Sequence, residues 1–413
     1  MLRILSIILG ISLVLTGCVQ TNNKATPSSD ELAIQQVNAN MYIGDFGKRL
    51  DSLTYEFQHP VNINHFEGMR FIVHAIFSAT NDTPSTVSKA IKVTSVKVHG
   101  KSLTIGLSDF DTQNLERLQI DSSVKALSTY QLNYYTKIRT VDEFKHHTFT
   151  AKDGTTLSYW LYLPNSQSPT PLMVWEHGGG EVLKSSYLRA NLEANRGATT
   201  WIEHHEKTAV LSVQYPENYS FGIADVPDQF EQMQRYNTAK YELIQTLIKS
   251  GEVTPNRVYI SGASSGGGAA LRFIMQYPKL FAAALVIAPK DTIVPLSDRY
   301  DLAYKFNAGP NALRLSQAEY ESSYQEMENA LSDSDITSVP MWFAHALNDH
   351  ICTRYTSTMM YDILKRKGAK NIHITLYSDD IMRAYNTPYN HFSWVPTLDN
   401  ARIINWVYAQ RRP

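Results

Sequence analysis

The pattern of apolar and polar positions divides the chain into two bodies. Between about residues 38 and 138, apolar and polar residues alternate in short runs that are separated by turns rich in Asn, Asp, Pro and Gly. The clearest runs cover residues 52–57, 71–77, 91–98 and 102–107. Alternation with a period of two is typical of strands with one buried face, so residues 38–138 are predicted to form a small antiparallel β-sandwich. This part lacks a cluster of titratable residues suited to catalysis, which favours a structural or positioning role.

From about residue 140 the pattern changes to short apolar runs that alternate with helical periodicity. The predicted strands are 156–163, 172–175, 209–213, 258–260, 282–287, 340–344 and 372–377. The predicted helices are 229–248, 269–277 and 398–409. Continuous apolar strands between helices indicate a mostly parallel sheet with helices on both faces. We therefore predict an α/β domain over residues 139–413.

The first residues have the composition of an export signal. Arg3 is followed by an apolar run over residues 4–15, which is shorter than the about 20 residues that cross a membrane. The run ends in Leu-Thr-Gly-Cys, which resembles the lipobox of bacterial lipoproteins. We predict a signal peptide over residues 1–17, and a lipidated Cys18 with a flexible tether over residues 18–37. The protein would then be extracytoplasmic and anchored to a bacterial membrane. The alternatives are an uncleaved anchor and an ordinary signal with an incidental cysteine.

Composition excludes several other classes of protein. The 38 Lys and Arg residues balance 39 Asp and Glu residues, for a formal net charge of −1. This balance lacks the concentrated positive field of a nucleic-acid binder, so no nucleic-acid partner is expected. The two cysteines, Cys18 and Cys352, form no CxxC pair, so neither a disulfide framework nor a zinc site is expected.

The candidate nucleophile is Ser264, within the sequence Gly-Ala-Ser-Ser-Gly at 262–266. This sequence matches G-x-S-x-G, which places a serine on a sharp turn from a strand into a helix. The neighbouring pattern supplies this setting, because an apolar strand at 257–261 precedes the motif and a helix pattern opens at Gly267.

A second glycine-rich turn is a candidate oxyanion hole. The sequence His-Gly-Gly-Gly at 177–180 follows an apolar strand. Glycines there let backbone N–H groups turn toward a developing oxyanion, which needs two donors. We predict donors from Gly178 or Gly179 and from Ser265, the residue after the nucleophile. The alternative is a glycine-rich turn with no ligand.

The acid and the base should follow the serine in that order. Asp349 lies just beyond a predicted strand, where a parallel sheet gathers its functional residues. His391 lies 42 residues further on, after the last predicted strand. We predict that Asp349 orients His391 and that His391 is the base.

The remaining candidates are less favoured. Asp379 and Asp380 follow the next strand along, and are the alternative acids. Four histidines either precede the serine or flank Asp349 closely, and a fifth lies within a strand: His204, His205, His345, His350 and His373. Trp394, close to His391, is expected to anchor the terminal helix rather than to line the site.

Four segments carry a specific resemblance: LMVWEHGGGE, NRVYISGASSGGGAALRFIMQYPKLFAAAL, VPMWFAHALNDHICT and NHFSW. With them, the chain from about residue 140 resembles α/β-hydrolases of the predicted-peptidase and polyhydroxybutyrate-depolymerase-like esterase group. The segments GDFG and SLTYEFQHPVN make the first body similar to the immunoglobulin-like domain that precedes some of these esterases. Two departures are Glu176, where the group usually has an apolar residue, and the long stretch 290–338, which we interpret as a lid.

These features predict a serine carboxylic-ester hydrolase of the cell envelope that forms an acyl-enzyme on Ser264. The chemistry requires no metal and no organic cofactor. The expected substrate is a small-molecule or polymer-borne ester, and the sandwich could position a polymeric one. Two alternatives remain: a serine peptidase of the same fold, and a surface-binding lipoprotein with a degenerate hydrolase body.

Overall fold

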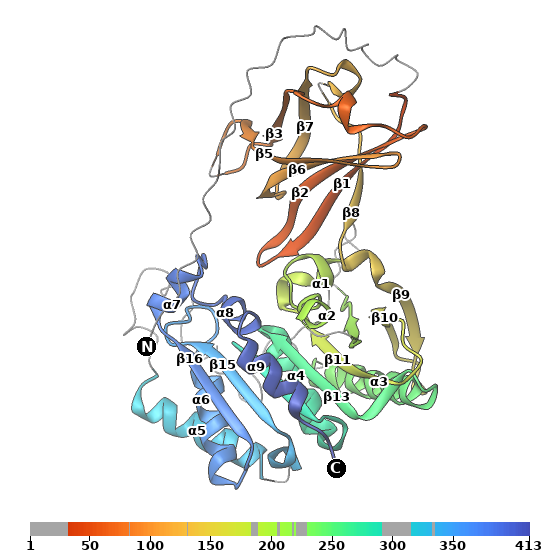
Figure 1. The fold of residues 1–413 in the computed structure, drawn as a ribbon. Helices are drawn as coiled ribbons and strands as arrows, with labels where there is room; N and C mark the ends of the chain where they lie inside the picture. Colours follow the sequence, from red (N-terminus) through yellow and green to blue (C-terminus); the bar gives the residue numbers. More distant parts are fainter. Residues whose placement is uncertain are drawn as a thin grey trace, which may run out of the picture.

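The computed structural model describes residues 32–413 except 82, 130, 183–188, 205–206, 217–218, 220–228, 291–314 and 333–334. The described residues form an all-β unit followed by an α/β unit, which lie at opposite ends of the view in Figure 1. The leader, Cys18 and the tether up to residue 31 lie outside the described residues, so export and lipidation stay predictions.

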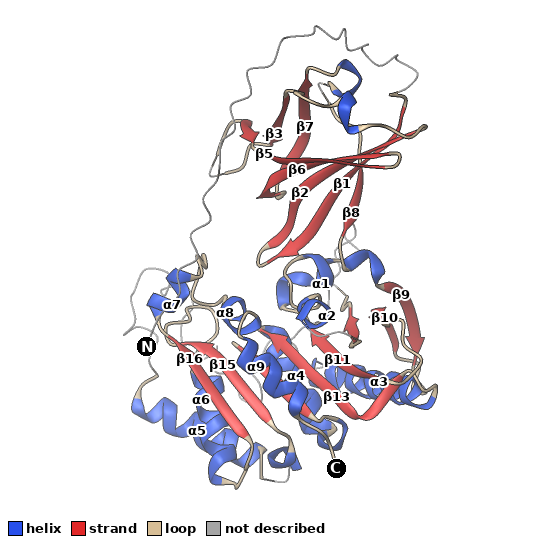
Figure 2. Cartoon of the chain, viewed as in Figure 1, coloured by secondary structure: helices blue, strands red, loops and turns tan. Residues whose placement is uncertain are grey.

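The all-β unit consists of two sheets (Figure 2). Its strands are β1 (Ile34–Gly44), β2 (Gly47–Phe57), β3 (Phe71–Phe77), β4 (Val87–Ile91), β5 (Val93–His99), β6 (Ser102–Asp111), β7 (Leu115–Ser122) and β8 (Tyr135–Ile138). One sheet has the order β5-β6-β2-β1-β8 and the other β4-β3-β7. All pairs are antiparallel except β1 with β8. The all-β character follows from the alternating pattern, whereas the immunoglobulin-like assignment stays a prediction.

The all-β unit begins before residue 38, where the sequence predicts its start. Strand β1 begins at Ile34, which pairs with Phe57 of β2. The last four residues of the predicted tether therefore belong to the sheet. Val37 is buried, because the alternating pattern of β1 extends back to these residues.

The α/β unit is built on one eight-stranded sheet of order β16-β15-β14-β13-β11-β12-β10-β9. Its strands are β9 (Lys145–Thr150), β10 (Thr156–Tyr162), β11 (Thr170–Glu176), β12 (Ala209–Val213), β13 (Val253–Ala263), β14 (Ala283–Ile287), β15 (Met341–Ala346) and β16 (Ile372–Tyr377). Strand β10 pairs antiparallel with both β12 and the edge strand β9, and the six strands from β16 to β12 run parallel. The central strands read as continuous apolar runs because both of their faces are covered.

Helices cover both faces of this sheet. They are α1 (Ala190–Glu193), α2 (Thr200–His204), α3 (Gln229–Lys249), α4 (Ser265–Gln276), α5 (Gln317–Ala330), α6 (Tyr355–Arg366), α7 (Asp379–Ala384), α8 (Trp394–Leu398) and α9 (Ala401–Ala409). Successive residues of β11 show the two layers: Leu172 and Val174 pack in the core with α3, α4 and α6. Met173 and Trp175 pack in the core that contains α8 and α9.

The helices differ from the prediction in several places, since none is predicted at α1, α2, α5, α6 or α7. The terminal helix predicted over 398–409 is divided at Asn400, whose side chain caps α9 by accepting from the N–H groups of Arg402 and Ile403. The stretch 290–338 is not irregular throughout, since it contains α5. Residues 291–314 lie outside the described residues, so the lid stays a prediction. No helix within the described ranges is both long and apolar enough to cross a membrane.

Candidate active site

Ser264 occupies the sharp turn between β13 and α4. Its backbone has φ +58° and ψ −125°, which is a strained conformation for a residue with a side chain. The turn requires glycine on either side, because a Cβ at Gly266 would lie 2.0 Å from the Glu176 carbonyl oxygen. A Cβ at Gly262 would lie 2.4 Å from the Gly266 carbonyl oxygen. The strand, the turn and the helix therefore hold the serine hydroxyl at the carboxyl end of the sheet.

The structure brings Ser264, His391 and Asp349 together. The Ser264 hydroxyl donates to His391 Nε2 over 2.9 Å, and His391 Nδ1 donates to Asp349 Oδ2 over 2.9 Å. All three come from segments that follow β-strands of the same sheet: the β13–α4 turn, the loop after β15 and the loop after α7. His391 is almost fully buried, and its ring packs edge-on against Trp394 at 5.4 Å.

Asp349 is buried and held as a carboxylate. Its Oδ1 accepts the backbone N–H groups of Ile351 at 2.8 Å and Cys352 at 2.9 Å. Burial alone would raise the pKa of the Asp349 carboxyl, but His391 and His345 outweigh it and hold that pKa well below its ordinary value. Asp349 is therefore ionised near neutral pH in the folded chain.

His345 contacts the same carboxylate, which the sequence reasoning missed. Its Nε2 lies 3.2 Å from Asp349 Oδ2 and 3.0 Å from the Cys352 carbonyl oxygen. Its Nδ1 lies 2.8 Å from Ser357 Oγ. The loop after β15 turns back on the strand, so a separation of only four residues does bring the two side chains together. His345 supports the acid, while His391 faces the serine.

Asp379, the alternative acid, joins two loops of the site. It accepts hydrogen bonds from the side-chain amides of Asn348, at 3.0 Å, and Asn390, at 2.8 Å. These asparagines precede Asp349 and His391 in the chain. Asp379 thus links the loop that carries Asp349 to the loop that carries His391.

Among the described residues, the other candidates form no hydrogen bond with the serine, His391 or Asp349, and part of the remaining set lies outside the described residues. Asp380 is exposed and pairs with Arg383. His373 of β16 stacks on Trp342. The His350 side chain has a buried Nδ1 with no hydrogen-bond partner. The side chain of His204 and all of His205 lie outside the described residues.

The predicted oxyanion turn follows β11 directly. Residues Gly179–Glu181 form a 3₁₀ turn, η4, with Gly178 at its N-cap. His177 is fully buried; its Nδ1 donates to the Gly178 carbonyl over 2.8 Å, and its Nε2 accepts the Tyr215 N–H over 3.2 Å. Burial lowers the pKa of His177 to about 4, so the ring is neutral and carries its proton on Nδ1.

Both glycines predicted as donors stay candidates. Asn195 donates its side-chain amide to Glu181 Oε1 over 2.8 Å. Burial raises the pKa of Glu181 to about 8. Gly179 and Ser265 each open a helical turn, where N–H groups lack intrahelical acceptors, which favours them as the two donors.

Two residues near the serine complete its surroundings. Trp394 packs on Phe392 at 4.7 Å as well as on His391, so it both anchors α8 and supports the base. Cys352 is buried, with Sγ 3.9 Å from Ser264 Oγ. Among the described residues, no group of three His, Cys, Asp or Glu side chains could hold a metal ion.

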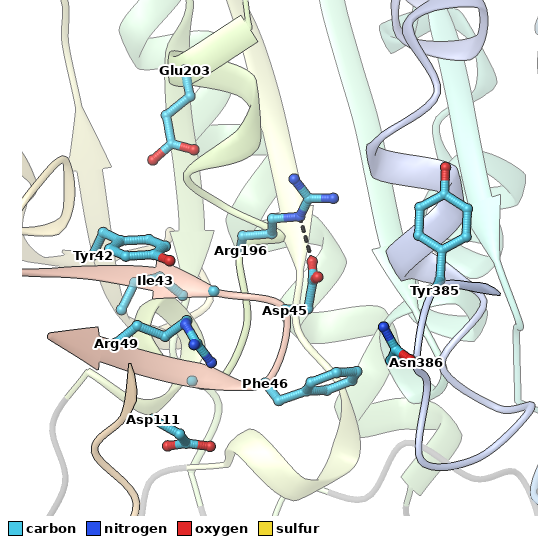
Figure 3. Close-up of a pocket in the computed structure, with 12 residues that line it drawn as sticks. Tyr42, Ile43, Asp45, Phe46, Arg49, Asp111, Arg196, Glu203, Tyr385 and Asn386 are labelled. Carbon is cyan, nitrogen blue, oxygen red and sulfur yellow. Dashed lines mark ion pairs between the residues drawn. The ribbon is translucent and has the colours of Figure 1, made fainter. Parts of the chain in front are cut away.

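The tip of the β1–β2 hairpin reaches the α/β unit beside this site. Asp45 forms an ion pair with Arg196 at 2.7 Å, and the Phe46 ring meets the Phe392 ring edge-on at 5.2 Å. Figure 3 shows Asp45 facing Arg196 and the Phe46 ring extending toward Asn386. A cavity of about 400 Å³ lies between the hairpin and the α/β unit. Because Phe392 follows His391, the all-β unit contacts the loop that carries the base.

The sheet order, the strained serine and its hydrogen-bonded histidine and aspartate define a serine hydrolase of the α/β-hydrolase fold. The chain matches the prolyl oligopeptidase family over residues 240–380, a span that contains Ser264 and Asp349. No match is found among curated proteins.

Among the similar solved structures, one with a TM-score above 0.5 shows the same fold. A thermostable esterase is 20% identical, with a TM-score of 0.65 over 92% of this chain and 100% of that chain. An acylaminoacyl peptidase of Pyrococcus horikoshii is 13% identical, with a TM-score of 0.44 over 88% of this chain and 54% of its own. A hyperthermophilic esterase of Pyrobaculum calidifontis is 18% identical, with a TM-score of 0.43 over 64% of this chain and 86% of its own.

Proposed function

We propose that the chain is a serine carboxylic-ester hydrolase of the carboxylesterase type. The observation that carries this proposal is the continuous hydrogen-bond path from Ser264 through His391 to Asp349, with both distances at 2.9 Å. A surface-binding protein with a degenerate hydrolase body would have no need for this path or for the strained serine. The intact path therefore favours an enzyme over the binding alternative.

The residues perform acyl transfer in two halves. His391 takes the proton from the Ser264 hydroxyl, and Oγ attacks the ester carbonyl. The N–H groups of Gly179 and Ser265 stabilise the resulting oxyanion. Collapse of this tetrahedral intermediate breaks the bond between the carbonyl carbon and the alcohol oxygen. The alcohol leaves after taking the proton from His391.

Water completes the cycle. His391 removes a proton from a water molecule, which attacks the acyl carbonyl and forms a second oxyanion in the same hole. Collapse then breaks the bond to Ser264 Oγ, which regains its proton from His391 as the acid leaves. Asp349 keeps Nδ1 of His391 protonated and stabilises the ring while it is charged.

Hydrolysis of p-nitrophenyl acetate, butyrate and octanoate by the chain from Val19 onward tests the proposal, with Ser264→Ala alongside. We expect activity that Ser264→Ala lowers by about 10⁴-fold or more, because the covalent step is removed. The dependence on chain length would measure the acyl pocket. Activity that is undiminished in Ser264→Ala, or absent with every ester, would contradict the proposal.

A serine peptidase is the second candidate, favoured by the match of residues 240–380 to the prolyl oligopeptidase family. Ester and amide acyl transfer use the same arrangement of groups, so the fold is compatible with both. Peptide p-nitroanilides assayed beside the esters discriminate between them. A higher kcat/KM for the anilides, lost in Ser264→Ala, would assign the site to peptides.

We also propose that the enzyme works at the cell envelope, tethered through a lipid on Cys18. The support is the leader pattern and the polar stretch after it. The all-β unit would then lie between the anchor and the site, where it could position a polymer-borne ester.

A further inference from the structure

A buried polar cluster lies behind the oxyanion turn. Glu176, the last residue of β11, and Lys240 of α3 are both buried and form an ion pair. Tyr215, two residues beyond β12, donates its hydroxyl to Glu176 Oε2 over 2.6 Å and accepts from Lys240 Nζ over 2.8 Å. Both oxygens of the carboxylate are therefore engaged, and three separate elements meet at one point.

This cluster is joined to the oxyanion turn at two places. Glu176 precedes His177 in the chain, and Tyr215 donates its backbone N–H to His177 Nε2 over 3.2 Å. The Tyr215 and His177 rings also pack at 5.1 Å. Fixing Glu176 and Tyr215 therefore fixes His177, whose Nδ1 holds the Gly178 carbonyl. The Gly178 carbonyl and the Gly179 N–H belong to the same planar peptide group, so holding the carbonyl also sets the direction of the N–H.

A contribution to stability does not by itself explain this buried cluster. Removing two charges from water is costly, and a buried ion pair stabilises a fold no better than apolar residues of similar size do. The ion pair instead fixes the orientation of the Glu176 side chain, because a carboxylate bound by two fixed partners can adopt only one orientation. The backbone that carries this carboxylate leads straight into the turn.

We propose that Glu176, Lys240 and Tyr215 are positioning residues that fix His177 and, through it, the direction of the Gly179 N–H toward the oxyanion. The inference rests on the proposed acyl-transfer function and concerns the same site. None of the three touches the ester. Their effect is expected on the transition state, where the oxyanion exists, and not on substrate binding.

Tyr215→Phe is the mildest test, because it removes one hydroxyl and keeps the backbone N–H to His177. The matched control is Tyr259→Phe on β13, which removes an equally buried hydroxyl that donates to the Gln410 carbonyl over 2.9 Å, away from the turn. Both variants are assayed with p-nitrophenyl acetate, and active enzyme is counted by titration with a serine-directed phosphonate.

For Tyr215→Phe we expect kcat per active site to fall about 10-fold, less than the about 10²–10³-fold that loss of an oxyanion donor costs. KM should change less than about 3-fold, and binding of a trifluoromethyl ketone, which forms the oxyanion on the enzyme, should weaken in parallel with kcat. Tyr259→Phe should keep kcat per active site even if its melting temperature falls.

The double variant Glu176→Leu/Lys240→Met removes both charges together, so that neither is left buried alone. It should fold, and should show the same loss of kcat and of ketone affinity as Tyr215→Phe or a larger one. A kcat per active site close to that of the wild type in both Tyr215→Phe and the double variant would overturn the inference. So would an equal loss in Tyr259→Phe.

These outcomes are separate from a failure of the proposed function. If the wild type hydrolyses no ester, or if Ser264→Ala retains the activity, the proposed function fails first. If the wild type depends on Ser264 and the cluster variants match it, only the positioning role is wrong.

Discussion

At the scale of single residues, the turn proposed as the oxyanion hole lies between two ionisable side chains, His177 and Glu181, that are both uncharged near neutral pH. Burial lowers the pKa of His177 to about 4 and raises the pKa of Glu181 to about 8. The unfolded chain takes up a proton on His177 below about pH 6.5, so stability falls from there down to about pH 4. The unfolded chain loses the Glu181 proton above about pH 4.3, so stability falls as the pH rises toward 8.

Glu181 therefore sets an alkaline limit that can be measured. As the pH passes about 8, a carboxylate forms beside Gly178 and repels the developing oxyanion. We expect the kcat of the wild type to decline there and that of Glu181→Gln to persist, in assays from pH 6 to pH 10. Glu203→Gln, an exposed residue of α2, is the control. A decline that is unchanged in Glu181→Gln would contradict this.

The sequence can identify a catalytic residue when it follows a predicted strand and when its order along the chain matches the order that the fold requires. Ser264, Asp349 and His391 each follow a strand pattern, in the order that the fold demands. The closeness of His345 to Asp349 in sequence argues against a contact between their side chains, but a tight loop brings them within 3.2 Å of each other. The meeting of Glu176 with Lys240 could not be read from the chain, because 64 residues separate them and only the packing of α3 on the sheet unites them.

At the scale of elements, strands were easier to predict than helices near the site. The parallel strands of the hydrolase sheet are short, mostly apolar runs that the pattern predicts, whereas β9, whose residues are polar and mostly exposed, is not predicted. Helix α5 was missed, although the sequence holds its signal: Ser316 and Glu319 form a capping box. Its apolar face is narrow, with only Ser323 and Met327 fully buried, so periodicity alone gave little sign of it.

The β1–β2 hairpin is the element whose contribution to catalysis is easiest to isolate. Phe46→Ala removes the contact with Phe392, which follows the base. Edge-on aromatic pairs contribute about 0.5–1.5 kcal/mol, so we expect kcat/KM on p-nitrophenyl acetate to fall about 2- to 10-fold.

The control for this prediction is Phe77→Ala, which removes a similar edge-on pair with Phe110 inside the all-β unit. It should lower the melting temperature but leave kcat/KM close to that of the wild type. Equal effects of the two substitutions on kcat/KM would show that the hairpin has no particular influence on the site.

At the scale of the whole molecule, the two units share one continuous apolar core. The cluster that contains Leu53 and Leu103 of the all-β unit also contains Trp175 and Leu285 of the hydrolase sheet. Three contacts reinforce this interface, two ion pairs and one aromatic pair: Asp45 with Arg196, Lys48 with Glu193 and Phe46 with Phe392. The two units should therefore unfold together.

The anchor is a property of the whole chain that fractionation can test. Cys18→Ala should move the protein from the membrane fraction to the soluble fraction, because the lipid is attached to the thiol and the uncleaved leader is short. The measurement is the distribution of ester-hydrolase activity after lysis and centrifugation. Continued retention in the membrane fraction would contradict lipidation.

The position of α9 has a consequence for how the protein is made. Ile403, Ile404 and Val407 cover the face of the sheet that also carries Leu285 and Trp342. These residues are synthesised after every strand of the sheet and after His391. A growing chain that has not yet reached α9 therefore leaves this sheet face uncovered, and one that has not reached His391 has no complete triad. Serine-hydrolase activity must therefore wait until most of the described chain has been made.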